Sequence, residues 1–316
     1  MINSAFIFPG QGSQFVGMLS ELAARYPLIQ DLFSLVSDKV GYDLWQLTQE
    51  GPESILNQTE NTQVAMLTAD VAVFKLLQKL GVEQAQIMAG HSLGEYAALV
   101  CANAISLTDA AQLVAKRGQL MQEYVPLGQG AMAAIVGLTD EQVDAICRQA
   151  SDSKYQVTPA NYNAIGQVVI AGHIEAVEKA LVLAEDMDAR MAKIIPVSVP
   201  CHCPLLVNAA NAFAEYLERA NFKTPEIAVI SNVDLSIYKS PEQMRLMLKE
   251  QLYSPVRWVE TIQLMKKRGI ERVIECGPGK VLSGLVKRID KSLTAISIND
   301  NASLEQALSQ LLEKSY

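Results

Sequence analysis

The segment that most constrains this chain is Gly90-His91-Ser92-Leu93-Gly94, which lies between a short apolar run and a stretch of helical character. A serine between two glycines at such a junction is typical of a nucleophile elbow, a sharp turn from a strand into a helix. The glycines remove side chains that would clash, and the serine projects at the helix N-terminus, where backbone N–H groups can stabilise an oxyanion. The alternative is a serine that only caps the helix.

Short apolar runs alternate with helical segments in both the first and the last third of the chain. Residues 5–8 and 85–89 are predicted as buried strands, and residues 64–80 carry apolar residues at helical spacing. The same pattern resumes with strands at 228–233 and 272–277. This alternation predicts an α/β fold, α/β-hydrolase-like, with a mostly parallel sheet.

The middle of the chain follows a different order of elements: strand, helix, strand, strand, helix, strand. The two central strands are expected to form a hairpin that turns at Ala164–Ile165, and Thr139 is placed to cap the first helix. This βαββαβ order is typical of a ferredoxin-like unit. We therefore expect a ferredoxin-like small domain (128–197) inserted into a large α/β catalytic domain formed by residues 1–127 and 198–316.

Charge and composition exclude several classes of protein. The formal net charge of −8 argues against a nucleic-acid binder, which would need a basic face. No stretch of about 20 apolar residues predicts a membrane span, and the apolar run near the N-terminus is too short for a signal peptide. Five cysteines without a CxxC pair indicate reduced thiols. We expect a cytoplasmic protein, and a monomer.

A serine hydroxyl needs a base nearby to act as a nucleophile, and the chain has three histidines. His91 is next to the serine on a tight turn and points elsewhere. His173 follows the second hairpin strand and is expected to cap a surface helix. His202 lies at the junction where the chain re-enters the large domain, among apolar residues with a proline on each side. His202 is therefore the predicted base.

Metal and nucleotide sites are not expected. Cys201-His202-Cys203 are consecutive and cannot all face one tetrahedral centre, and no second ligand cluster follows. We expect the two cysteines to be structural. The glycine-rich segments at 9–17 and 276–281 lack residues that a dinucleotide fingerprint or a phosphate loop requires. No metal, redox or nucleotide cofactor is predicted.

Four further stretches separate this chain from a generic hydrolase. They are FPGQGSQ at 8–14, GHSLGE at 90–95, VSVPCHC at 197–203 and GPGKVLSGL at 277–285. Together they resemble the malonyl-CoA:acyl-carrier-protein transacylase family, in its stand-alone bacterial form, along essentially the whole chain. The resemblance implies transfer of malonyl from malonyl-CoA to the phosphopantetheine thiol of holo acyl carrier protein through a serine ester, for fatty acid biosynthesis.

The resemblance also implies roles for individual residues. Ser92 would be the nucleophile and His202 the base. The backbone carbonyl of Gln251, in EQLYSPVRW, would orient the histidine in place of a hydrolase's acid. The backbone amides of Gln11 and Leu93 would form the oxyanion hole.

Arg117 matches the arginine that pairs with the free carboxylate of malonate in this family. Its planar guanidinium can hold a carboxylate through two parallel hydrogen bonds, which a lysine cannot do. The alternative is an ordinary helix-surface arginine beside Lys116. Asn161 and Asn163 lie where the family's small domain borders the acyl pocket, although asparagines are also common in turns.

Four residues carry further expectations. Lys287 and Arg288 are a possible docking site for carrier protein, with a solvated helix face as the alternative. Cys201 stands where serine is usual in the family, which would place a thiol beside the site and suggests sensitivity to oxidation or alkylation. Leu93 after the serine resembles malonyl-selective rather than methylmalonyl-selective members.

Two other functions fit parts of the sequence. A serine esterase or thioesterase on a related scaffold would need an Asp or Glu to orient His202, and it would hydrolyse simple esters rapidly. A non-catalytic docking module would bind carrier protein through its basic residues without forming an acyl-serine. Transfer is the expected activity, because the elbow and the base are both present.

Overall fold

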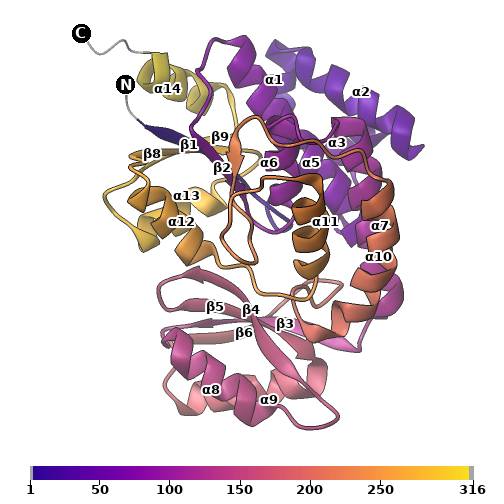
Figure 1. Cartoon of the computed structure of the whole chain (residues 1–316), viewed down its shortest axis with the longest axis vertical. Coiled ribbons are helices and arrows are strands. Elements are labelled where there is room, and N and C mark those ends of the chain that lie inside the picture. Colours follow the sequence, from indigo (N-terminus) through magenta and orange to yellow (C-terminus); the bar gives the residue numbers. More distant parts are fainter. Residues whose placement is uncertain (1–2, 313–316) are drawn as a thin grey trace.

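The computed structural model describes residues 3–312 and contains two separate sheets (Figure 1). The larger sheet has the strand order β7-β2-β1-β8-β9 and is parallel throughout, and the smaller has the order β4-β5-β3-β6 and is antiparallel. The α/β class predicted from the sequence is confirmed. The strands are β1 Ser4–Phe8, β2 Ile87–Gly90, β3 Gly130–Val136, β4 Val157–Ala164, β5 Gln167–His173, β6 Met191–Ile195, β7 Ala228–Val229, β8 Arg272–Cys276 and β9 Thr294–Ile298.

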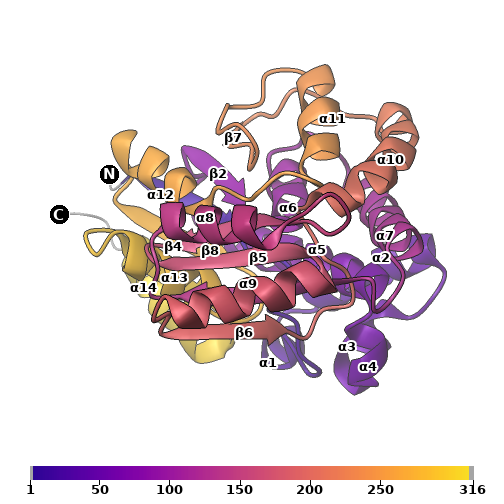
Figure 2. The same ribbon diagram turned by 90° about the horizontal axis from the view of Figure 1, so that it is seen from below.

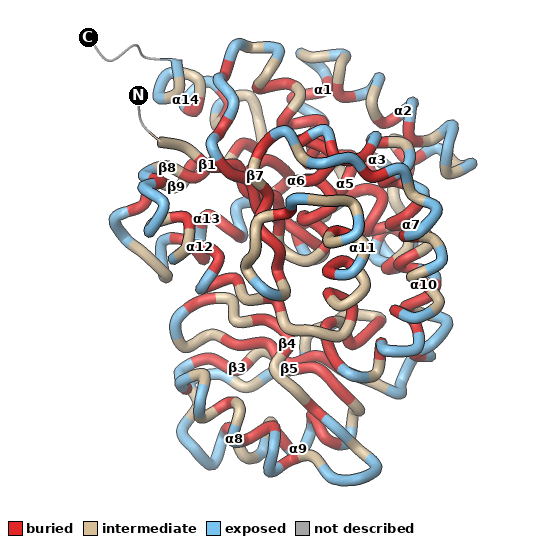
Figure 3. The backbone as a smooth tube through the Cα atoms, in the orientation of Figure 1, coloured by how far each residue is buried: buried red, intermediate tan, exposed pale blue. Residues whose placement is uncertain are grey.

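Helices surround the parallel sheet and cover both of its faces (Figure 1), as parallel sheets require. Figure 3 shows the buried residues concentrated in the strands and in the helices that pack against them. The helices are α1 Ser20–Arg25, α2 Leu28–Val40, α3 Leu44–Glu50, α4 Glu53–Leu56, α5 Thr59–Lys79, α6 Gly94–Cys101, α7 Leu107–Tyr124, α8 Asp140–Ala150, α9 Ile174–Asp186, α10 Val207–Arg219, α11 Pro241–Glu250, α12 Trp258–Lys267, α13 Val281–Ile289 and α14 Asn301–Leu312.

Helix α5 is buried along most of its length and starts at Thr59 rather than at residue 64 as predicted. Its first turns contain Thr59, Thr62 and Gln63, which are polar but buried. These residues break the apolar periodicity on which the sequence prediction relied. Thr59 contacts Gln11 and Gln63 contacts Arg117, two residues of the site described below, while Thr62 donates to the Leu56 carbonyl.

The small sheet has the strand order that a βαββαβ ferredoxin-like unit produces, and α8 and α9 cover one of its faces (Figure 2). Thr139 caps α8 in a complete capping box, as expected. The β4–β5 turn falls at Ile165–Gly166, one residue later than predicted, because Gly166 supplies the positive φ of +68° that the tight turn needs. The domain boundaries at 127/128 and 197/198 remain a prediction.

The strand predicted at 228–233 is only two residues long, Ala228–Val229, so that prediction was wrong in extent. The chain leaves the sheet after Val229 because Asn232 turns toward the end of β2, where its side chain donates to the Gly90 carbonyl at 2.7 Å. The small sheet is tied to this region as well: the Tyr162 amide donates to the Val256 carbonyl at 3.0 Å. These connections bring both sheets to the end of β2.

Candidate active site

The turn after β2 can be made only with glycine at both ends of the motif. A Cβ atom on Gly90 would lie 1.8 Å from the Gly94 carbonyl carbon, and one on Gly94 would lie 2.1 Å from the Phe8 carbonyl oxygen. Ser92 itself has a φ of +53°, a left-handed conformation that is costly for a residue with a side chain. The sequence motif is therefore a true elbow rather than a helix cap.

Asn232 holds this strained turn in place. Its Oδ1 accepts a hydrogen bond from the Ser92 amide at 2.8 Å, and its Nδ2 donates to the Gly90 carbonyl at 2.7 Å. One side chain thus satisfies a donor and an acceptor on either side of the bend. Sequence reasoning missed Asn232, because its segment was read as a strand.

Ser92, His202 and Gln251 form a continuous hydrogen-bonded line. The Ser92 Oγ lies 2.7 Å from His202 Nε2, and His202 Nδ1 lies 2.7 Å from the Gln251 carbonyl oxygen. Since a carbonyl only accepts, Nδ1 carries the proton and Nε2 presents a lone pair to the serine. His202 also has a left-handed backbone, with a φ of +61°.

The electrostatic surroundings keep the imidazole neutral. Burial, and after it the positive charge of Arg117, lower the pKa of His202 to about 3. The hydrogen bond to the Gln251 carbonyl acts in the opposite direction and raises this pKa. His202 is therefore in its neutral form, the form that can accept the serine proton, across the ordinary pH range.

The loop after β1 packs directly against the elbow. A Cβ atom on Gly10 would lie 2.5 Å from the His91 carbonyl oxygen, so the next residue, Gln11, is brought beside the serine. Gln11 and Leu93 both line the cavity that contains Ser92. Within residues 3–312, neither of their backbone N–H groups donates a hydrogen bond to a protein atom. Both amides are thus available to an oxyanion.

Arg117 points inward from α7, with only 2 % of its surface exposed, so the surface-arginine alternative is wrong. Its Nη1 donates to Gln63 Oε1 and its Nη2 to Gln251 Oε1, both at 2.9 Å. Both acceptors are neutral amides. The buried Nε has no hydrogen-bond partner among the described residues, which leaves the guanidinium with unused donors. Sequence reasoning did not find Gln63.

These groups surround one cavity of about 220 Å³ between the two sheets. Asn161 and Asn163 line it from strand β4, not from a turn. Asn163 Oδ1 lies 2.7 Å from His91 Nε2, which turns the His91 ring away from the serine as expected. The wall also carries apolar side chains from the small sheet, the segment after it and α13: Met132, Val169, Ile195, Val197, Val281, Leu282 and Leu285.

Cys201 lines the cavity beside His202, while Cys203 is fully buried. Burial raises the pKa of the Cys201 thiol to about 11. A protonated thiol is a poor nucleophile, which argues against the predicted sensitivity to alkylation.

In the described part of the chain, no group of three or more His, Cys, Asp or Glu side chains is arranged to hold a metal. No helix among those residues is long and apolar enough to cross a membrane.

The remaining candidates lie outside the cavity. Lys287 and Arg288 are exposed on the last turn of α13, the helix whose first turns line the cavity, and Arg288 Nη1 donates to Gln167 Oε1 at 2.6 Å. Docking at these residues stays a prediction. His173 is the N-cap residue of α9, but its ring accepts from the Gln156 amide at 3.0 Å instead of capping the helix.

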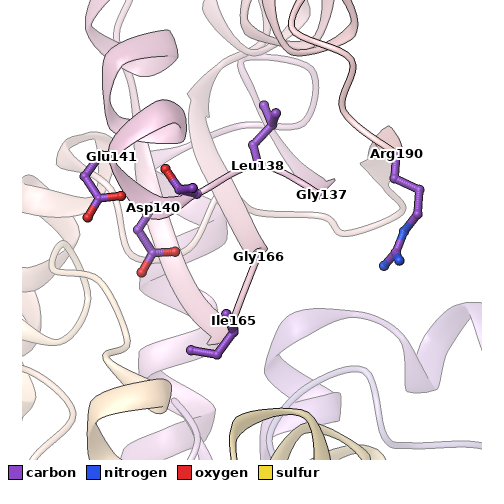
Figure 4. Close-up of a pocket in the computed structure, with 8 residues that line it drawn as sticks. Gly137, Leu138, Asp140, Glu141, Ile165, Gly166 and Arg190 are labelled. Atoms are coloured by element: carbon purple, nitrogen blue, oxygen red, sulfur yellow. The ribbon is translucent and has the colours of Figure 1, made fainter.

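A second, more open depression of about 400 Å³ lies beside the small sheet (Figure 4). It shares no lining residue with the Ser92 cavity. Asp140 and Glu141 lie on one side of it and Arg190 on the other. No histidine, cysteine or lysine lines this depression, so the chemistry is expected at Ser92.

Comparison with known proteins agrees with this geometry. The model of the acyl transferase domain family matches residues 5–307, and the chain belongs to the acyl transferase family. It is 47 % identical to the malonyl CoA-acyl carrier protein transacylase of Salmonella typhimurium over 98 % of this chain and 100 % of that protein. It is 48 % identical to the protein of the same name from Escherichia coli K12, over 98 % and 99 % of the two chains.

Solved structures give the same result. The malonyl CoA-acyl carrier protein transacylase of Coxiella burnetii superposes with a TM-score of 0.96 at 47 % identity, covering 98 % of each chain. A malonyl-transacylase solved in complex with a type II polyketide synthase acyl-carrier protein also gives a TM-score of 0.96 at 47 % identity, covering 98 % of this chain and 99 % of that one.

Proposed function

We propose that this acyltransferase moves a malonyl group from malonyl-CoA to the phosphopantetheine thiol of acyl carrier protein, through an ester on Ser92. The observation that carries the proposal is the hydrogen-bonded line from the Ser92 Oγ through His202 to the Gln251 carbonyl, in the same cavity as a buried arginine. The names of the relatives support the choice of donor and acceptor.

In the first half-reaction, the Ser92 Oγ attacks the thioester carbonyl while its proton passes to His202 Nε2. The C–S bond then breaks, and the imidazolium returns the proton to the departing coenzyme A thiolate. The carbonyl oxygen carries negative charge in the tetrahedral intermediate. The amides of Gln11 and Leu93 would stabilise that charge.

In the second half-reaction, His202 takes the proton of the phosphopantetheine thiol. The sulfur attacks the ester carbonyl, the C–O bond breaks, and Ser92 regains its proton. Donor and acceptor therefore react in turn at one serine, which is a ping-pong scheme. No step in this scheme requires a metal or redox cofactor.

Arg117 would select the acyl group. Among the described residues, its buried guanidinium donates to two neutral amide oxygens, and its Nε has no hydrogen-bond partner. A carboxylate at the far end of a malonyl group would supply the missing acceptors. An uncharged acyl group would leave the arginine buried and unpaired.

The esterase alternative required an acidic side chain on His202 Nδ1. The acceptor at that position is the Gln251 backbone carbonyl, at 2.7 Å. That difference and the names of the relatives favour transfer over hydrolysis. Supply of fatty acid biosynthesis, a cytoplasmic location and a monomeric state remain parts of the proposal that follow from the sequence.

Intact-protein mass spectrometry tests the proposed function directly. Mixing the protein with malonyl-CoA is expected to give a malonyl adduct that persists until holo acyl carrier protein is added, and then moves to the carrier. Rapid release of free malonate without carrier protein would instead identify an esterase, and carrier binding without any adduct would identify a docking module.

Replacing Arg117 by alanine is expected to lower malonyl loading of Ser92 on the order of 10²-fold, because two hydrogen bonds to a charged group are lost. Loading of acetyl or butyryl groups should stay the same or increase, since no buried charge then opposes them. Single-turnover loading rates with the three acyl-CoA substrates measure this. Equal losses for all three would remove the selecting role from Arg117.

A further inference from the structure

The side chain of Gln251 has no part in the proposed chemistry, which uses only its backbone carbonyl. Its Nε2 donates to Glu95 Oε2 at 2.6 Å and to the Ser92 carbonyl at 3.0 Å. Its Oε1 accepts from Arg117 Nη2 at 2.9 Å. A carboxylate and a carbonyl accept while a guanidinium only donates, so the direction of this amide is fully determined.

Glu95 lies in the first turn of α6, directly after the elbow, and is 1 % exposed. Tyr238 Oη, Gln251 Nε2 and the Asn232 amide all donate to its carboxyl group. Since every neighbour that it bonds donates, the site suits an ionised carboxylate, which accepts only. Burial raises the pKa of Glu95 to about 7, and the hydrogen bonds from Tyr238 and Gln251 oppose that effect.

Glu95 and Arg117 do not form a direct ion pair, and the Arg117 charge is the smallest of the influences on the Glu95 pKa. The Gln251 amide stands between the two charges and bonds both of them. A carboxylate in direct contact would occupy the guanidinium that the acyl carboxylate needs. An intervening amide fixes the guanidinium and leaves its charge for the substrate.

We infer that Glu95 and the side chain of Gln251 are positioning residues that hold the Arg117 guanidinium toward the cavity and thereby set selectivity for a malonyl group. The inference rests on the proposed function of Arg117 and deepens it. In the described part of the chain, the Arg117 guanidinium donates to two amide oxygens, those of Gln63 and Gln251, and lies over the Tyr96 ring. Removing either anchor frees a long side chain whose precise orientation decides whether two parallel bonds form.

The test replaces Gln251 by methionine, which has a similar length, lacks the amide and keeps the backbone carbonyl that orients His202. Malonyl loading of Ser92 is expected to fall about tenfold to hundredfold, the range for losing a hydrogen bond to a charged group. Acetyl loading does not use Arg117, so the ratio of malonyl to acetyl loading should fall about tenfold. Gln251→Glu should lower malonyl loading at least as much, because its carboxylate would pair with Arg117.

A double-mutant cycle separates positioning from a general structural effect. In an Arg117→Ala background, Gln251→Met should lower the rate of malonyl loading by less than about twofold, because the arginine that Gln251 positions is already absent. Glu123→Gln, an exposed residue on the same helix as Arg117, is the matched control and should match wild type. An equal loss for malonyl and acetyl, or the same loss in both backgrounds, would overturn the inference.

Three further outcomes are decisive. If thermal unfolding shows that Gln251→Met does not fold, Glu95→Gln decides, with a fall in the malonyl-to-acetyl ratio expected and an unchanged ratio overturning the inference. Wild-type protein that takes no malonyl group at all would overturn the proposed function and the inference with it. Wild-type protein that loads normally, with an unchanged ratio in the variants, would overturn the inference alone.

Discussion

Replacing Ser92 by alanine is expected to abolish the acyl adduct and to lower malonyl transfer to carrier protein on the order of 10⁶-fold, the loss seen when a serine nucleophile is removed. No other hydroxyl lies in hydrogen-bond contact with His202 among the described residues. Intact mass after mixing with malonyl-CoA measures the adduct. A thiol assay for released coenzyme A, in the presence of holo carrier protein, measures the turnover.

The fold of this variant should be unchanged. The Ser92 amide, not its side chain, bonds Asn232, and alanine can adopt the same backbone that the flanking glycines and Asn232 impose. A thermal unfolding temperature equal to that of wild type would show this. Ser309→Ala, on the exposed side of α14, is the matched control and should load normally. An adduct on the Ser92→Ala protein would place the nucleophile elsewhere.

The parts of the site that depend on one short segment could be predicted from the sequence. The two glycines around Ser92 are required by contacts within a few residues and with the loop after β1. His202 could be chosen because only three histidines exist and one lies at a rigid junction. In both cases a local pattern determines the geometry.

The parts that depend on several segments meeting in space could not be predicted from residue patterns alone. Asn232, Gln63 and Glu95 are buried polar residues from three separate segments, and each has its partners far away in the chain. A buried polar residue breaks the apolar periodicity that marks a helix or strand, so it makes the prediction of its own element worse. This explains the late start predicted for α5, whereas the strand predicted after residue 228 was too long because Asn232 turns toward the end of β2.

The role of Gln251 could not be predicted from residue patterns either. Its backbone carbonyl holds His202 and its side chain holds Arg117. Any residue type could supply the carbonyl, so the sequence offers no chemical signal for it, and only the family resemblance indicated the position. The structure adds that this residue joins His202, the proposed base, to the arginine proposed to bind the acyl carboxylate.

Replacing His202 by alanine is expected to slow serine acylation by about 10²- to 10⁴-fold, the usual contribution of a positioned general base. The Ser92 Oγ would lose its acceptor at 2.7 Å, while the elbow and the amides of Gln11 and Leu93 would be retained. Single-turnover loading with malonyl-CoA measures the rate. His173→Ala, at the N-cap of α9 and outside the cavity, is the control and should load at the wild-type rate.

The pH dependence of loading distinguishes a buried base from an ordinary exposed histidine. The neutral form of His202 is the active one, so the rate is full above its pKa and is lost as the pH falls through it. Burial and the Arg117 charge lower that pKa to about 3, and we therefore expect a nearly constant rate of acetyl loading from pH 8 to pH 5, since loading from acetyl-CoA does not depend on Glu95 and Arg117. In Arg117→Ala the positive charge is gone, the pKa of His202 rises, and the decrease with acetyl-CoA as substrate should begin at a higher pH than in wild type. A wild-type rate that halves near pH 6.5 would mean that the imidazole is not shielded as described, and that a different group takes the serine proton.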